Sequence, residues 1–295
     1  GHLVFLHQVL DFNRPHANSP TFKLSQRPSF RYSDTRFIGV ITEKYMADAA
    51  RPQIRGRFTS CELVRREELT EDLVKFWIKP AQDYVFKPGQ YCTIGHNGVE
   101  RAYSIASAPH EKRIELFIEL IPVEEGGVLT PLLWGLGEGD KVTIRPRAKG
   151  IFTFKDEKKH QLLVSTVTGV VPYVSFVRDY LQAGKSGHHF YVLEGASYSD
   201  EFVYDTEFIA LSKEHPELIT FVPTVSRPEE QRNNDWTGDK GRVNAIVLDK
   251  IQQLGLPTEE TMVYACGHPG MIEDVKEKVV HLGFDFLEER FWKDD

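Results

Sequence analysis

The chain has 295 residues, of which 41% are hydrophobic and 27% charged, and this length suits two domains of ordinary size. The net charge of −7 argues against a general nucleic-acid-binding protein, whose contact surface would be basic. The three cysteines cannot supply the four thiolates of an iron–sulfur cluster, nor a secreted disulfide framework, so we expect a cytoplasmic protein. The longest uncharged stretch, residues 161–177, is too short to cross a bilayer, and we expect no integral membrane segment.

An N-terminal arm of uncertain role is predicted over residues 1–56. Its first 36 residues carry five basic and two acidic side chains, together with three prolines. The opening Gly1-His2 resembles an expression remnant, which does not belong to the fold. Residues 37–50 are predicted to form one short helix.

A β-barrel is predicted over residues 57–155. Short apolar runs are separated here by turn residues such as Pro88-Gly89 and Asn97-Gly98, which is typical of antiparallel strands. The expected strands are 58–64, 73–78, 91–94, 102–106, 114–121 and 141–144, with one short helix over 130–134. Strands of this length and spacing indicate an antiparallel barrel.

An α/β domain is predicted over residues 156–295, where apolar strands alternate with helices. The expected strands are 161–167, 190–193, 219–225 and 262–265, and the expected helices are 172–183, 205–214, 243–254 and 270–282. Such alternation indicates a doubly wound parallel sheet.

Three of these strands end in residues suited to a nucleotide, and ligands bind at this edge of a doubly wound sheet. The first strand leads through Thr168-Gly169 to a helix near Pro172, where backbone N–H groups can approach a pyrophosphate. The second ends at Ser226-Arg227, with Arg242 after a loop, and a guanidinium group pairs well with phosphate. The third ends at Cys266-Gly267. Taken singly, these features also fit a plain connecting turn, a solvated arginine and a small packed cysteine.

The barrel half contains Arg101-Ala102-Tyr103-Ser104 on an expected strand. Because side chains alternate along a strand, Arg101 and Tyr103 face one side and Ser104 the other. A cation beside an aromatic ring suits a phosphate and a flat ring, and an exposed cross-strand pair is the alternative. Residues 126–130 precede an expected helix and suit an anion, or else form a simple loop. No spacing of metal ligands occurs, so no metal is expected.

In this order the motifs resemble those of the ferredoxin–NADP reductase family, most closely its bacterial branch, over residues 57–295. The shared motifs are Lys87-Pro88-Gly89-Gln90-Tyr91, Arg101-Ala102-Tyr103-Ser104, Gly126-Gly127-Val128-Leu129-Thr130, Gly139-Asp140, Gly150-Ile151-Phe152, Thr168-Gly169-Val170-Val171-Pro172, Val225-Ser226-Arg227 and Cys266-Gly267-His268-Pro269. The resemblance implies an FAD-binding barrel domain followed by an NADP-binding α/β domain.

For the flavin, the resemblance implies that Arg101 binds the pyrophosphate, that Tyr103 stacks on the isoalloxazine and that Ser104 contacts the ring near N5. It places Ala102 in the same site. The other implied FAD-binding residues are Phe117, Ile118, Glu119 and Leu120 along one strand, and Gly127, Val128, Leu129 and Thr130 at the diphosphate.

For the nicotinamide nucleotide, the resemblance implies that Thr168 contacts both cofactors in a turn shaped by Gly169 and Pro172. Ser226, Arg227 and Arg242 would hold the 2′-phosphate of NADP. Cys266 and Gly267 would line the nicotinamide pocket, and Trp292, or else Phe291, would cover the flavin. Ser104, Cys266 and Tyr103 are the expected catalytic residues, which act by positioning the rings and not through a covalent bond.

The implied reaction is hydride transfer from NADPH to FAD, followed by single-electron transfer to ferredoxin or flavodoxin. Two groups of basic residues, Arg65-Arg66 and residues 145–149, form either a patch for an acidic carrier or ordinary surface charge. Glu194 and Ser197 lie where some bacterial members carry an arginine, and this keeps NAD possible. Two alternatives therefore stay open, namely an NADH-dependent reductase serving an oxygenase or other redox partner, and a non-catalytic flavin-binding subunit of a redox complex.

Overall fold

The computed structural model describes residues 58–290. The predicted arm, the predicted helix over 37–50, and Phe291 and Trp292 lie outside the described residues.

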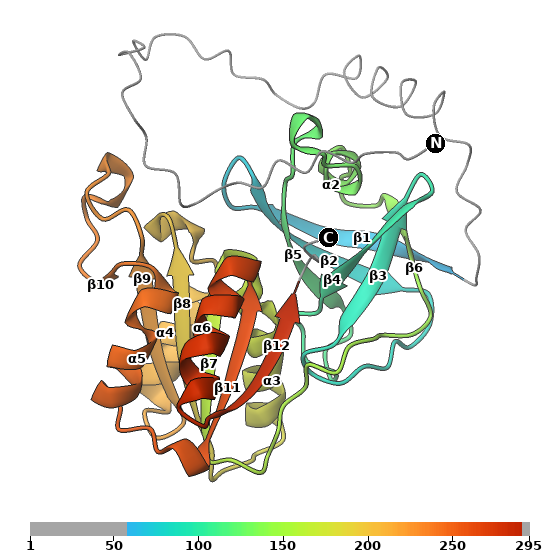
Figure 1. Cartoon of the computed structure of the whole chain (residues 1–295). Coiled ribbons are helices and arrows are strands. Elements are labelled where there is room, and N and C mark those ends of the chain that lie inside the picture. The colour runs from blue at the N-terminus through green and yellow to red at the C-terminus, as the bar shows by residue number, and fades with distance from the viewer. Residues whose placement is uncertain (1–57, 291–295) are drawn as a thin grey trace, which may run out of the picture.

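The first half of the described chain is an antiparallel six-stranded sheet that curls into a barrel (Figure 1). Its strands are β1 (Thr59–Glu68), β2 (Leu73–Pro80), β3 (Tyr91–His96), β4 (Val99–Ser104), β5 (Ile114–Glu119) and β6 (Lys141–Ile144), and α2 (Leu129–Trp134) and the 3₁₀ turn η1 (Val123–Glu125) lie between β5 and β6. The strand order is β4-β3-β6-β1-β2-β5, which leaves β4 and β5 as the two edges. Alternate side chains of β2, such as Val74, Phe76 and Ile78, fill the barrel interior.

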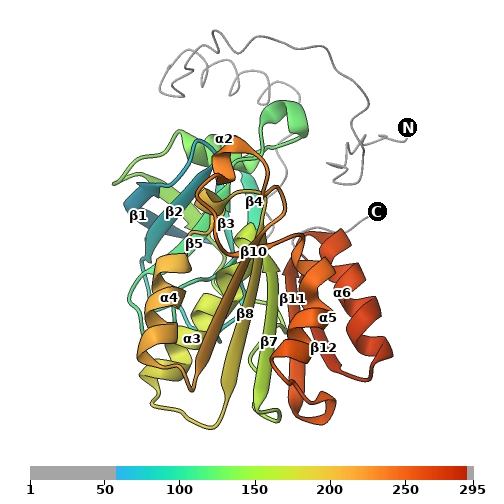
Figure 2. The ribbon, with the colours of Figure 1, turned by 90° about the vertical axis from the view of Figure 1, so that its left-hand side faces the viewer.

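The second half is a parallel sheet of order β10-β9-β8-β7-β11-β12. The strands are β7 (His160–Thr166), β8 (His189–Ala196), β9 (Ile219–Val225), β10 (Asp239–Lys240), β11 (Thr261–Gly267) and β12 (Asp285–Arg290). The helices are α3 (Val171–Gln182), α4 (Asp205–Glu214), α5 (Val243–Gln253) and α6 (Pro269–His281), with 3₁₀ turns η2 (Val167–Val170), η3 (Ser199–Glu201), η4 (Gln231–Asn233) and η5 (Thr258–Glu260). Figure 2 shows α3 and α4 on one face of the sheet and α5 and α6 on the other. The predicted fold, a barrel followed by a doubly wound α/β domain, is confirmed.

Two strands were not predicted, and several strand boundaries differ from the predictions, among them that of β4. β4 begins at Val99 and not at residue 102, because Asn97 and Gly98 take left-handed φ angles of 49° and 83° and close a two-residue hairpin. β10 has only two residues, and β12 is an edge strand of mostly charged residues. Neither has the apolar run on which the strand predictions rested.

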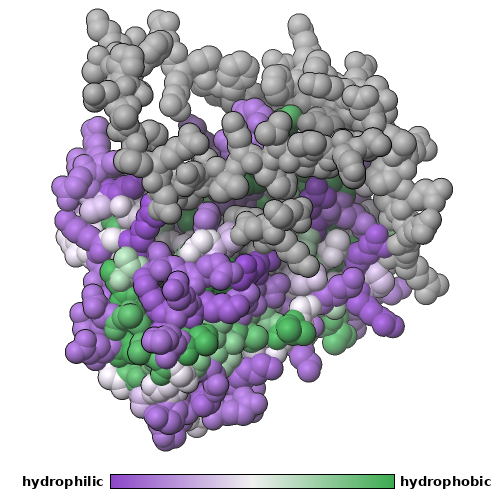
Figure 3. Space-filling model, in the orientation of Figure 1, coloured by the Kyte–Doolittle hydropathy of each residue, from purple (hydrophilic) through white to green (hydrophobic). Residues whose placement is uncertain are grey.

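The two halves share one buried cluster. It contains Ala106 and Phe117 from the barrel together with Val170, Phe176 and Cys266 from the α/β half, all at most 4% exposed. Figure 3 shows hydrophobic surface on the α/β half between areas of hydrophilic surface. None of the helices within residues 58–290 has the length and apolar character that a membrane span requires.

Candidate functional site

The two edge strands of the barrel, β4 and β5, do not pair with each other, and the line along which they meet is called the seam here. The Ala106 N–H group donates a hydrogen bond to the Glu115 carbonyl at 2.9 Å, and β4 and β5 run in opposite directions from this point. Residues that precede Ala106 along the chain therefore lie opposite residues that follow Glu115. This places Arg101–Ser104 opposite Phe117–Leu120. The structure therefore brings together the two segments that the sequence assigned to the flavin.

On β4, the side chains alternate as predicted. Arg101 is exposed, and its positive charge lies close enough to Tyr103 to oppose the rise in pKa that burial imposes on the phenol. Tyr103 packs against the barrel core, while Ser104 is 9% exposed and faces the other way. Ala102 is exposed on an edge strand, where backbone groups lack a strand partner on one side. An exposed cation, an aromatic ring and backbone groups without a strand partner on one side are thus combined in four residues.

Replacing Tyr103 by alanine should release bound flavin. The phenol ring is the only large aromatic surface within Arg101–Ser104, and a stacked ring contributes about 1–3 kcal/mol to binding. We expect Tyr103→Ala to weaken FAD binding roughly 10- to 100-fold. The ratio of absorbance at 450 nm to that at 280 nm after dialysis measures it. A variant that keeps full 450-nm absorbance and turnover would show that Tyr103 does not stack on the flavin.

On β5, most side chains are directed away from the seam. Phe117 lies in the cluster shared by the two halves, and Ile118 and Leu120 lie in the barrel core. Backbone groups and the exposed Glu119 remain for a ligand. Although the Glu119 side chain reaches solvent, the protein packed around its carboxyl group removes part of its hydration, and nearby carboxylates, of which Asp72 is foremost, add to this effect; together they raise the pKa of Glu119 to about 7.

The raised pKa of Glu119 predicts a pH-dependent effect on stability. Its carboxyl group ionises near pH 4.5 in the unfolded chain and near pH 7 in the native one, so the native state binds more protons and loses stability as pH rises through this window. We expect Glu119→Gln to raise the Tm of the flavin-free protein at pH 8, with a gain that shrinks as pH falls and is nearly absent at pH 4. Thermal unfolding followed by circular dichroism across this range measures it. A gain independent of pH would contradict the assigned pKa.

The loop before α2 is tightly folded. A Cβ atom at Gly127 would lie 1.8 Å from the Ile121 carbonyl oxygen, so glycine is required there. The Thr130 hydroxyl donates to the Ile121 carbonyl and accepts from the Ile121 N–H group. No side chain caps the helix at Val128. The backbone N–H groups of Val128 and Leu129 are therefore better placed for a diphosphate than the Thr130 hydroxyl, which already has two partners.

Two backbone segments also approach each other closely at the carboxyl ends of β7 and β11. A Cβ atom at Gly169 would lie 2.1 Å from the Cys266 carbonyl oxygen, and one at Gly267 would lie 2.3 Å from Thr166 Oγ1. Gly267 has a φ of 126°, which favours glycine. Val167, in the same turn, has a φ of 40°, an unusual conformation for a β-branched residue. The turn after β7 thus crosses directly over the end of β11, with Gly169 and Gly267 buried at the crossing and Thr168 partly exposed beside it, where the sequence predicts the nicotinamide.

The polar groups of this turn fix its position. Thr166 Oγ1 accepts a hydrogen bond from the His268 N–H group at 3.0 Å, and His268 Nδ1 accepts from Gly270 N–H at the start of α6. Thr168 is partly exposed, and Pro172 lies in the first turn of α3, where its missing N–H group costs nothing. The Cys266 side chain is fully buried, and burial raises the pKa of its thiol well above the ordinary value. Cys266 is thus a neutral thiol, without the character of a nucleophile.

The arginines predicted at the second strand end lie on adjacent backbone. β10 pairs with the end of β9, and the Gly241 N–H group donates to the Val225 carbonyl at 2.8 Å. Arg242 therefore follows next to Ser226-Arg227, at the edge where β8 also ends. Arg227 and Arg242 are both exposed. Arg227 Nη1 donates to the Tyr198 hydroxyl at 2.9 Å.

Comparison with known proteins supports this arrangement. Residues 163–277 match the family model described as an oxidoreductase NAD-binding domain. The chain is 29% identical to ferredoxin–NADP reductase of Pseudomonas aeruginosa over 64% of this chain and 76% of that protein. It is 29% identical to a component of the Na⁺-translocating NADH-quinone reductase of Serratia proteamaculans, over 66% of this chain and 49% of that one. A ferredoxin NADP⁺ reductase from Neisseria gonorrhoeae, solved with bound FAD and NADP, superimposes with a TM-score of 0.69 at 23% identity, over 81% of this chain and all of that chain.

The chain has the fold of ferredoxin–NADP reductases and is similar in sequence to members of that family. It spans 62%, 49% and 46% of the first three curated relatives that it matches.

Within this family fold, two residues near the arginines were missed by the sequence reasoning. Arg232 Cζ lies 4.2 Å from the centre of the Tyr198 ring, and Arg232 also pairs with Asp200 at 2.7 Å. Asn233 holds this loop by donating to the carbonyls of Ser197 and Arg227. Only the long loop between β9 and α5 brings Arg232 next to Tyr198, so no local sequence pattern indicates it.

The structure places Glu194, one of the two residues that kept NAD possible, away from the protein surface. Its side chain is fully buried on β8, and neither carboxylate oxygen has a hydrogen-bond partner among the described residues. Burial, with a smaller effect of Asp205, raises the pKa of Glu194 well above its ordinary value. A carboxyl group enclosed in this way cannot reach a nucleotide at the surface.

The candidate basic residues do not form one patch. Arg66 donates to the carbonyls of Trp134 and Leu136 and is a structural residue. Arg65 stacks on Trp77. β1 pairs with β6 from Thr59↔Ile144 to Glu62↔Lys141, so Arg65-Arg66 and residues 145–149 lie beyond opposite ends of that pairing. Among the second group, Arg145 pairs with Glu100 at 2.5 Å.

The end of the described chain lies beside the turn over β11. β12 pairs with β11 up to Gly267↔Arg290, so the residues that follow Arg290 start at the edge that carries Cys266 and Gly267. The roles predicted for Phe291 and Trp292 lie outside the described residues. Within residues 58–290 no cluster of three or more His, Cys, Asp or Glu side chains is suited to a metal ion.

Proposed function

We propose that the chain is an FAD-containing oxidoreductase that uses NADPH and passes electrons to ferredoxin or flavodoxin. When bound, the cofactors supply hydride transfer from the nicotinamide to the flavin and the release of single electrons. The observation that carries the proposal is the shared cluster of Ala106, Phe117, Val170 and Cys266, which joins the β4–β5 seam to the turn over β11. Two sites suited to flat rings and phosphates therefore belong to one rigid contact between the halves.

The chain's own residues act by binding and orientation. Arg101 offers an exposed guanidinium group to the flavin pyrophosphate, Tyr103 offers its ring face, and Ser104 lies at the end of the seam. Thr168 and the backbone of Gly169 and Gly267 provide a close-packed floor for the nicotinamide. Reacting atoms must approach to about 3–3.5 Å, so this floor determines whether transfer occurs. An aromatic ring from Trp292 or Phe291 over the flavin would have to move aside first.

NADPH is proposed over NADH because positively charged side chains gather at the sheet edge where β8 and β9 end. Arg227 and Arg242 are exposed on adjacent backbone, and Arg232 lies close by on Tyr198. A 2′-phosphate carries the charge that such a group of arginines binds. Glu194, the residue that favoured NAD, is enclosed. An NADH-dependent reductase stays the second candidate, because Ser197 lies where an arginine is expected and because one relative is named as part of an NADH-quinone reductase.

The experiment that tests the proposal is a visible spectrum of the purified protein, followed by anaerobic titration with NADPH and, separately, NADH. We expect a flavin band that NADPH bleaches efficiently and NADH poorly. Preference for NADH would favour the second candidate. A flavin band that neither nucleotide bleaches would indicate a non-catalytic flavin-binding subunit. Reduction of added ferredoxin and flavodoxin by the NADPH-reduced protein then tests the proposed partners.

A further inference from the structure

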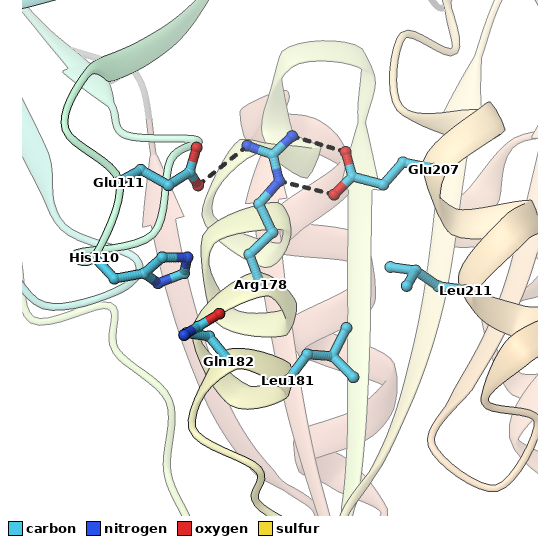
Figure 4. A pocket seen from close by; sticks show the side chains of 7 residues that line it. All are labelled: His110, Glu111, Arg178, Leu181, Gln182, Glu207 and Leu211. Carbon is cyan, nitrogen blue, oxygen red and sulfur yellow. Dashed lines mark hydrogen bonds and ion pairs between the residues drawn. The ribbon is translucent and has the colours of Figure 1, made fainter.

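We propose that Arg178 is a positioning residue that holds the two halves of the protein in the relative orientation that hydride transfer requires. The inference rests on the proposed function. Arg178 lies in α3, and its Nη1 donates to Glu115 Oε2 of β5 at 2.7 Å. Its Nε and Nη2 donate to the two oxygens of Glu207 in α4, each at 2.7 Å. Figure 4 shows the guanidinium group between Glu207 and Glu111, which belongs to the barrel and lies 3.6 Å from Nη1.

The barrel carboxylate in this cluster is bound entirely by the α/β half. Glu115 has a side chain 4% exposed, and its second oxygen accepts a hydrogen bond from the Tyr204 hydroxyl at 2.9 Å. Lys75 of the barrel lies 4.0 Å from the centre of the Tyr204 ring and donates to the Val203 carbonyl. A buried carboxylate is tolerated only while it is paired, and separating the halves would remove both hydrogen-bond donors of the Glu115 side chain.

A second anchor lies one turn earlier on the same face of α3. Ser175 Oγ donates to the Ser107 carbonyl at 2.8 Å, and both residues are fully buried. The Ser107 hydroxyl accepts from the Glu115 N–H group at 3.2 Å. Because Ser175 and Arg178 are three residues apart, they project from one face of the helix. That face contacts the barrel through one buried and one partly buried polar contact, which together fix both rotation and distance.

The two elements joined by Arg178 carry the two halves of the candidate site. α3 begins directly after the turn of Thr168 and Gly169, about 10 Å along the helix axis from Arg178. β5 continues from Glu115 to Phe117, about 7 Å away, and then along the seam. A small rotation of the halves would therefore change the distance between nicotinamide and flavin, while each binding site stayed intact.

A groove lies beside the cluster, and its lining is separate from the candidate site. It has a volume of about 530 Å³ and is lined by His110, Glu111, Arg178, Leu181, Gln182, Glu207 and Leu211 (Figure 4). None of these residues belongs to the seam, to the turn over β11 or to the sheet edge that carries Arg227 and Arg242. An effect of Arg178 on the reaction would therefore act through position and not through contact with a cofactor.

The first test compares Arg178→Met and Arg178→Lys with the control Lys158→Met, which removes a cation that pairs with Asp285 within the α/β half. Flavin reduction by NADPH is followed by stopped flow at increasing nucleotide concentration. We expect Arg178→Met to lower the limiting rate about tenfold or more, with a half-saturating concentration within about twofold of the wild type. Arg178→Lys should recover part of the rate, and Lys158→Met should leave it unchanged. An unchanged limiting rate in Arg178→Met would overturn the proposal.

A second test needs no activity. Scanning calorimetry of the wild type should show one cooperative transition, and Arg178→Met should show two, because the halves then unfold separately. A single transition at the wild-type temperature would also overturn the proposal. If Arg178→Met does not fold, Arg178→Lys and Glu115→Gln carry both measurements. If neither nucleotide reduces the wild-type flavin, the proposed function fails, and the calorimetric result still decides whether Arg178 joins the halves.

Discussion

We expect Gly169→Ala to slow flavin reduction by NADPH about 100-fold while flavin stays bound. The added methyl group would lie 2.1 Å from the Cys266 carbonyl oxygen and 2.9 Å from the Gly267 Cα atom. Both neighbours are backbone, so no side-chain rotation can relieve the contact, and the turn over β11 has to move. A displacement of about 1 Å at a reacting centre is enough for such a loss. The crowding should also lower stability by roughly 1–3 kcal/mol, or a Tm decrease of about 2–10 °C.

Gly137→Ala is the matched control for this change. Its Cβ would find its nearest neighbour at 4.0 Å, Asp140 Oδ2, and its φ is not left-handed. It should keep the wild-type Tm and rate. Stopped-flow reduction at saturating NADPH, with flavin content measured in parallel, separates a displaced turn from lost flavin. A Gly169→Ala protein that reacts at the wild-type rate would show that the nicotinamide does not bind against this turn.

The fold was largely predictable from the sequence because its elements carry strong local patterns. The barrel strands are short apolar runs between turn residues, and the α/β strands are continuous apolar runs buried on both faces, as in β7, where residues 161–165 are all buried. What escaped prediction depends on pairing with a distant segment. β10 exists because Asp239 and Lys240 meet the end of β9, and β12 is a charged strand held by β11. Local patterns contain no information of that kind.

The candidate site was predictable in part, for a similar reason. Arg101, Tyr103, Gly169 and Gly267 belong to short motifs, and the structure brings each to an edge or a close approach consistent with its expected role. The burial of Glu194 was not predictable, because a carboxylate at the end of a strand usually reaches solvent. The contacts of Arg66, Arg178 and Arg232 also escaped, since each depends on a partner at least 30 residues away.

We expect the double variant Arg227→Ala, Arg242→Ala to raise the KM for NADPH roughly 10- to 100-fold and to change the KM for NADH by less than about threefold. A charge-assisted hydrogen bond contributes about 1.5–3 kcal/mol, and 1.4 kcal/mol is a factor of ten. Only NADPH carries the 2′-phosphate that such bonds require. Limiting rates should stay near the wild-type value, because neither arginine lies at the turn of Thr168 and Gly169.

The charge of the protein changes in this double variant, and the control must change it equally. Arg113→Ala with Lys213→Ala removes two exposed cations away from the sheet edge where β8 and β9 end and should leave both KM values unaltered. Arg232→Gln adds a graded test, because its guanidinium group lies on Tyr198, to which Arg227 is also bonded. If Arg232 shares the phosphate, its loss raises the KM for NADPH alone by a smaller factor. Equal increases for NADPH and NADH in the double variant would contradict the 2′-phosphate assignment, because they would mean that the arginines contact the part that both nucleotides share.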